Sequence, residues 1–159
     1  MRIIDFNPSH RGAFQGDLAI FKLTDEEATR LKGWALKEPT RGSIRLLEGE
    51  VTGHHHEIVL DREADADLDA ETITVAALAI AKARASASRG TATLFTDESL
   101  LNALPWLVRK DLAIGFLVVS GGPVVLRHPE HDAIRLPVGT FYVGRQVESA
   151  GAAERVVAD

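Results

Sequence analysis

The chain has 159 residues, a net charge of −5 at neutral pH and no cysteine. This length is enough for one domain with a sizeable core, and 45% apolar with 26% charged residues is typical of a globular chain. The lack of cysteine excludes disulfides, thiolate metal sites and cysteine nucleophiles. An acidic chain without a cluster of Lys and Arg also argues against nucleic-acid binding.

Apolar runs in the sequence are short. None approaches the ~20 residues that span a bilayer, and the N-terminus lacks the apolar stretch of a signal peptide. We therefore expect no membrane partner, and a protein that is cytoplasmic or carried in a virion-like particle.

The first predicted elements are a strand and a helix. Residues 17–23 alternate in polarity and hold β-formers, which predicts a strand. Thr24 and Glu27 have capping-box spacing at the start of an apolar helical pattern, which predicts a helix that ends before Pro39.

The middle of the chain changes from strands to helices. Residues 43–47 and 54–60 predict two strands joined by a glycine-containing turn. The stretch from about 61 to 111 is predicted to be a helical insertion, with an Ala-rich helix that ends near Gly90 and a short strand at 91–95.

The last third of the chain is the most β-like. Gly and Pro turns separate four short apolar runs, which span 112–119, 123–127, 132–136 and 140–147. Strands this close together pair antiparallel. We therefore expect a mainly β fold with an α insertion (α+β): a small antiparallel β-barrel or sandwich with two to three helices. Residues 1–159 would form a single domain, with its β core at 15–60 and 112–148, the insertion at about 61–111, and a peripheral tail at 149–159.

Three adjacent histidines, His54, His55 and His56, open the strand predicted at 54–60. Side chains alternate across a strand, so His54 and His56 should point inward with Ile58, and His55 should point outward. An inward imidazole must satisfy its ring nitrogens, because an unpaired buried polar group costs roughly 1–3 kcal/mol.

The sequence RHPEHD supplies candidate partners for the inward histidines. The inward histidines could bind zinc, iron, manganese or nickel together with the imidazole and carboxylate side chains of this RHPEHD turn. The candidate ligands are His54, His56, His128, His131 and Glu130. The alternative is that these side chains only form hydrogen bonds within the fold. Trp34 and Trp106 are predicted to be core anchors rather than base-stacking platforms.

Three segments of the chain resemble a family of small, uncharacterised bacterial and phage-borne proteins. The segments are QGDLAIFKL (15–23), EGEVTGHHHEI (48–58) and RHPEHDAIRLPVGTFYVGRQVE (127–148). The family pattern is G-E-x-T-G-H-x-H followed by E-H-x-P-I-x-L-P-x-G-x-Y-x-V-x-R-Q-x-E. The residues that match it are Gly53, His54, His56, Glu130, His131, Pro137, Gly139, Arg145, Gln146 and Glu148.

The chain departs from the pattern where Ala133 replaces the usual proline and where Phe141 precedes Tyr142, and residues 61–111 resemble an expanded insertion. None of these departures affects a motif histidine. The resemblance implies no reaction, because no activity is established for this family.

Two functions fit these observations. The first is a non-enzymatic binding or assembly protein, with a protein partner or a homo-oligomer, as a component of a phage or phage-like particle. The second is a His-ligated metalloprotein or metalloenzyme, with a divalent transition metal between the HHH strand and the HPEH turn. No complete catalytic motif is present, which favours the first, and the sequence names no substrate or cofactor.

Overall fold

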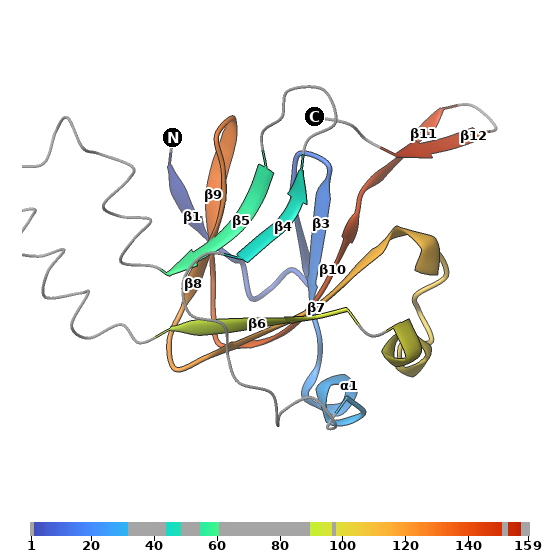
Figure 1. The fold of residues 1–159 in the computed structure, drawn as a ribbon, viewed down its shortest axis with the longest axis horizontal. Coiled ribbons are helices and arrows are strands. Elements are labelled where there is room, and N and C mark those ends of the chain that lie inside the picture. Colours follow the sequence, from blue (N-terminus) through green and yellow to red (C-terminus); the bar gives the residue numbers. More distant parts are fainter. Residues whose placement is uncertain are drawn as a thin grey trace, which may run out of the picture.

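The computed structural model describes residues 2–31, 44–48, 55–60, 90–96, 98–150 and 153–156. Most of these residues are in short strands (Figure 1). The strands are β1 (Ile3–Asp5), β2 (Gly12–Gln15), β3 (Leu18–Lys22), β4 (Ile44–Glu48), β5 (His55–Leu60), β6 (Thr91–Phe95), β7 (Ala113–Ser120), β8 (Val124–His128), β9 (His131–Leu136), β10 (Gly139–Arg145), β11 (Val147–Ala150) and β12 (Ala153–Val156). The helical elements are the α-helix α1 (Asp25–Thr29) and two 3-10 helices (Glu98–Ala103 and Lys110–Leu112).

Two five-stranded sheets make up the body of the protein. The first sheet has the order β1-β9-β8-β5-β4, and the second has the order β2-β3-β10-β7-β6. Neighbouring strands are antiparallel except for β1 and β9, which pair in parallel. The strands β11 and β12 form a separate hairpin that extends away from both sheets at the end of β10 (Figure 1).

The main hydrophobic core takes buried side chains from both sheets. It contains Phe6, Leu18, Ile20, Leu46, Ile58, Ala92, Leu117, Val119, Val124, Leu126, Ile134, Leu136, Phe141 and Val143. These residues follow the alternation of their strands, as with Leu18 and Ile20 on β3 and Val124 and Leu126 on β8. Burial of this apolar surface is what holds the sheets together.

A second cluster covers part of the outward face of the second sheet. It brings side chains of β6, β7 and β10 together with apolar residues that flank α1 and residues of the segment after β6. The members of this cluster are Leu23, Leu31, Phe95, Leu101, Leu104, Leu107, Phe116 and Tyr142. Both faces of the second sheet are therefore apolar over much of their area.

The predicted strand positions agree with the structure. The strands predicted at 17–23, 43–47, 54–60 and 91–95 correspond to β3, β4, β5 and β6, and the four runs of the last third correspond to β7 to β10. The mainly β class is confirmed, but the described strands form two sheets and not a closed barrel. The strands β1 and β2 were not predicted.

The helical predictions can be compared only in part. The capping box of Thr24 and Glu27 is present at α1, whereas residues 32–40 lie outside the described part of the chain. Residues 61–89 of the predicted insertion also lie outside it, and the rest of the insertion contains β6 and the 3-10 helix at Glu98–Ala103. Among the described residues, no helix is long and apolar enough to cross a membrane.

Candidate functional site

His56 is the histidine that strand alternation buries most completely. It lies on β5 with its side chain at 0% exposure, next but one to the core residue Ile58. His55 faces the other way and lies 3.4 Å from a Glu57 carboxylate oxygen. The predicted inward position of His56 is therefore confirmed, while His54 lies outside the described residues.

Both ring nitrogens of His56 contact side chains of the second sheet. Nδ1 lies 2.8 Å from Gln15 Oε1, and Nε2 lies 2.6 Å from Asp17 Oδ1. Gln15 ends β2 and Asp17 precedes β3, with Gly16 at φ 55° in the tight turn between them. The left-handed backbone at Gly16 suits glycine and lets the polar residues on both sides of it reach one imidazole. A polar contact thus joins β5 of the first sheet to the β2–β3 turn of the second.

The hydrogen bonds of Gln15 assign one proton of His56. Gln15 Nε2 donates to the carbonyl oxygens of Leu126 and Asp132 at 3.1 and 2.9 Å, so Oε1 is the acceptor and His56 Nδ1 donates to it. The contact with Asp17 needs one further proton, on either the imidazole or the carboxyl group. Both arrangements leave the His56–Asp17 pair without net charge, which suits its burial.

His128 and His131 lie beside His56 at the β8–β9 turn. The His128 ring is centred 4.3 Å from His56 and 4.7 Å from His131, and the His56 and His131 centroids are 6.5 Å apart. A register shift after Leu126 places His128 opposite His131, so that His131 joins the buried pair. The backbone N–H of Glu130 donates to His128 Nδ1 at 3.1 Å.

The structure thus brings together three of the five predicted metal ligands: His56, His128 and His131. Glu130 is exposed in the turn and contacts His128 through its backbone N–H. Coordination by His56 would require the loss of its contact with Gln15 or Asp17, because both ring nitrogens are already engaged. Within the described ranges, no group of three or more His, Asp or Glu side chains is arranged to hold a metal ion.

An aromatic surface on the outward face of the second sheet is a second candidate site. We define it as Phe14, Phe21 and Trp106. Phe14 is 56% exposed and Trp106 is 36% exposed. The Phe21 ring packs against both, with its centroid 5.9 Å from Phe14 and 6.0 Å from Trp106. The Arg11 guanidinium lies over the Trp106 ring, 5.0 Å from its centroid.

Two glycines allow the rings of this face to lie close to the sheet. Gly12 is the register partner of Phe21, and a Cβ atom at Gly12 would collide with the Phe21 ring. A Cβ at Gly144 would collide with Tyr142, whose ring packs edge-on against Trp106 at 5.6 Å. Trp106 therefore packs against the rings of Phe21 and Tyr142.

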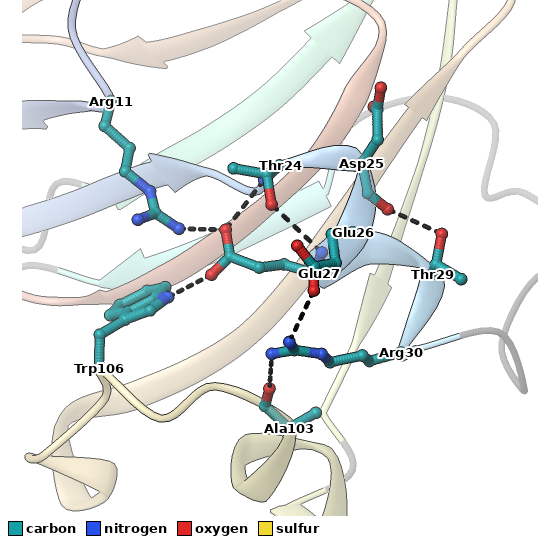
Figure 2. Close-up of polar contacts among 9 residues, drawn as sticks. All are labelled: Arg11, Thr24, Asp25, Glu26, Glu27, Thr29, Arg30, Ala103 and Trp106. Carbon is teal, nitrogen blue, oxygen red and sulfur yellow. Dashed lines mark hydrogen bonds and ion pairs between the residues drawn. The ribbon is translucent and has the colours of Figure 1, made fainter.

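Glu27 fixes the polar groups around Trp106 (Figure 2). Its carboxylate accepts hydrogen bonds from Arg11, from the Trp106 indole N–H and from the Thr24 backbone N–H. The Thr24 hydroxyl accepts from the Glu27 backbone N–H in return, which completes the capping box of α1.

The pKa of Glu27 is lowered to about 2. Burial alone would raise this pKa, but the hydrogen bonds from Thr24, Trp106 and Arg11 favour the carboxylate and together outweigh burial. Glu27 is therefore ionised at every pH at which the protein is expected to work, and it keeps Arg11 and Trp106 in place.

The sequence interpretation missed several residues of both sites. Trp106 was expected to be a core anchor but is partly exposed, because it closes the edge of the second cluster instead of filling its centre. Trp34 lies outside the described residues. Gln15 and Asp17 were not singled out as site residues, although the polar pair around Gly16 in QGD was a signal of a special turn.

The fold and the two sites define a class: a mainly β domain whose two sheets are joined by a buried His–carboxylate contact, with an aromatic surface on one outward face. A family model of a domain of unknown function, DUF8820, matches residues 14–146. The chain therefore belongs to the DUF8820 family, and this agrees with its resemblance to an uncharacterised family. No curated protein and no solved structure matches the chain significantly.

Proposed function

We propose that this protein is a non-enzymatic binding and assembly protein, and that the aromatic surface is its binding site. The observation that carries the proposal is the exposure of Phe14, which stands 56% exposed beside the Phe21 ring. An exposed aromatic row with an adjacent arginine has the composition of the residues that dominate protein–protein interfaces. The shared core supports the finer assignment of the two sheets as the layers of a β-sandwich.

The polar atoms of this site favour a protein partner over a sugar. Sugar recognition depends on hydrogen bonds beside the aromatic rings, but the Trp106 N–H and both Glu27 oxygens already bond within the protein. A nucleic-acid partner is disfavoured by the net charge of −5. What the surface offers is mainly apolar ring area, which an apolar protein surface would bury.

A phage-like particle, assembled in the cytoplasm, is the assembly to which we assign the protein. The support is the resemblance of residues 48–58 and 127–148 to motifs of small bacterial and phage-borne proteins.

Site-specific photo-crosslinking in producing cells tests the binding site. Phe14 would be replaced by p-benzoylphenylalanine, and Ile4, which is 41% exposed on β1 of the other sheet, would serve as the matched control position. The proposal predicts one discrete protein adduct from position 14 that is absent from position 4. Equal adducts at the two positions, or none at position 14, would contradict it.

A His-ligated metalloprotein is the second candidate function. It is favoured by the approach of His56 on β5 to His128 and His131 at the β8–β9 turn, with ring centroids 4.3 to 6.5 Å apart. It ranks second because His56 uses both ring nitrogens within the protein. The test is metal analysis of protein purified without a His-tag and soaked in zinc, iron, manganese or nickel. Binding near one equivalent that is lost in His131→Ala would support this function, whereas less than about a tenth of an equivalent would exclude it.

A further inference from the structure

A bulge in the β8–β9 pair decides to which side of the first sheet His131 points. Leu126 lies opposite Ile134, and His128 lies opposite His131. Between these two pairs, β9 has one residue more than β8. Ile134 belongs to the main core, so strict alternation along β9 would turn His131 to the outward face. The extra residue reverses this and places the His131 ring beside that of His128, with 4.7 Å between the centroids.

The backbone of the bulge presents two acceptors to a single side chain. Gln15 Nε2 donates to the carbonyl oxygen of Leu126 on β8 at 3.1 Å and to that of Asp132 on β9 at 2.9 Å. The peptide that carries the Asp132 carbonyl directs its N–H, which belongs to Ala133, to the carbonyl of Arg2 beside β1. Two carbonyl oxygens cannot bond to each other, so this part of the strand pair needs a group with two donors. The NH2 of a glutamine side chain is such a group.

Gln15 reaches the bulge from the second sheet. It is the last residue of β2, is 2% exposed, and accepts the Nδ1 proton of His56 at 2.8 Å through its own Oε1. Both donors and the acceptor of this amide are therefore engaged, on β8, β9 and β5. A buried amide that is bonded at both ends is held in one orientation, which also fixes the groups that it contacts.

We infer that Gln15 is a positioning residue, whose side-chain NH2 holds the bulge of β9 and thereby keeps His131 on the inward side beside His128. In a regular antiparallel ladder the strands supply donors to each other's carbonyls. Loss of the Gln15 amide would therefore favour the regular register, in which His131 turns outward. The inference goes beyond the proposed function, because it concerns how the fold brings these imidazoles together and not what the aromatic surface binds.

NMR of the purified full chain tests the inference by reporting the register. In the parent protein, backbone nuclear Overhauser effects (NOEs) should join His128 to His131. In Gln15→Met they should join His128 to Asp132 instead, because the regular register pairs these two residues. If Gln15 served stability alone, its replacement would lower the melting temperature and leave the NOE pattern as in the parent.

Gln146, the only other glutamine of the chain, provides the matched control. It donates to the Asp17 carbonyl through its backbone N–H, which Gln146→Met retains, so this variant should keep the parent NOE pattern. A second measurement needs no variant. In the parent, the side-chain NH2 protons of Gln15 should exchange with solvent at least about tenfold more slowly than those of Gln146, because they are bonded inside the protein.

Two results would overturn the inference. One is a folded Gln15→Met variant that keeps the NOEs between His128 and His131, and the other is equal exchange of the two glutamine side chains in the parent. If Gln15→Met does not fold, the exchange rates in the parent decide. None of these results bears on the proposed function, because that function is tested by the crosslink from position 14.

Discussion

At the scale of single residues, Glu27 has the largest predicted effect on the aromatic surface. One carboxylate joins the start of α1, the loop before β2 and the segment after β6, through Thr24, Arg11 and Trp106. Its side chain is only 10% exposed, so these hydrogen bonds are poorly replaced by water. Glu26 on the same helix is 82% exposed and pairs at 3.2 Å with Arg30, the residue that follows the helix.

Replacement of Glu27 by Gln should lower the free energy of unfolding by about 1–3 kcal/mol at neutral pH, because a charged hydrogen-bond acceptor is lost. The pKa of Glu27 is lowered from 4.5 to about 2, so its contribution is fully present above pH 4.5 and is lost as the pH falls toward 2. Urea unfolding at a series of pH values should therefore show a loss between pH 4.5 and 2 that Glu27→Gln lacks. Glu26→Gln, at 82% exposure, is the control and should change little.

Tyr142 gives the corresponding prediction at alkaline pH. Burial, followed by the negative charge of Asp111, raises the pKa of Tyr142 to about 12. The stability that comes from the neutral phenol is present below pH 10 and is lost as the pH rises through about 12. Tyr142 is the only tyrosine of the chain, so the phenolate absorbance reports it alone. We expect titration near pH 12 in the folded protein, and a value near 10 would contradict the packing of Tyr142 under Trp106.

At the scale of elements, the contact between the β2–β3 turn and β5 links the two sheets. His56 lies 41 residues from Gln15 and 39 from Asp17 in the sequence, so no local pattern could reveal the pairing. Alternation did predict the inward side of β5, because a one-residue change of register would expose Ile58. The sequence therefore identified His56 as an inward-pointing histidine. It did not identify the partners of His56, because these depend on how the two sheets face each other.

Replacement of Asp17 by Ala should destabilise the protein by about 3–5 kcal/mol, because it leaves His56 Nε2 buried without its hydrogen-bonding partner. Asp132→Ala is a suitable control. Its carboxylate pairs with Arg2 at the surface, with side chains 37% and 79% exposed, and its backbone carbonyl to Gln15 is retained. Removal of this surface pair should cost at most about 1 kcal/mol. Denaturant unfolding compares the two variants, and equal losses would mean that the His56–Asp17 contact adds little.

At the scale of the whole molecule, strand positions were predictable and sheet membership was not. The four runs of the last third became β7 to β10, but they divide between the sheets, with β7 and β10 in the second and β8 and β9 in the first. Single-strand patterns specify which face is apolar, and they do not specify which strand is the neighbour. The strand β1 escaped detection because only three residues pair with β9. The aromatic surface could not be predicted from the sequence for a related reason, because its rings come from segments that are adjacent only in the folded protein.

The two sheets should fold without the C-terminal hairpin. Within the described residues, β11 and β12 pair only with each other, and the DUF8820 match ends at residue 146, directly before β11. A two-stranded hairpin contributes little stability by itself. A chain that ends at Gln146 keeps the backbone hydrogen bond from Gln146 to Asp17 and should melt within about 4 °C of the full chain.

A chain that ends at Tyr142 provides the contrast. It loses the last three of the seven residues of β10, which pairs with β3 on one side and with β7 on the other, so the second sheet would be divided along part of its length. We expect this shorter chain to be unfolded or aggregated, because several ladder hydrogen bonds and the buried Val143 are lost together. Circular dichroism with thermal melting distinguishes the two truncations. If the chain ending at Gln146 unfolds as well, the hairpin must support the sheets, and residues 147–156 would belong to the folding unit.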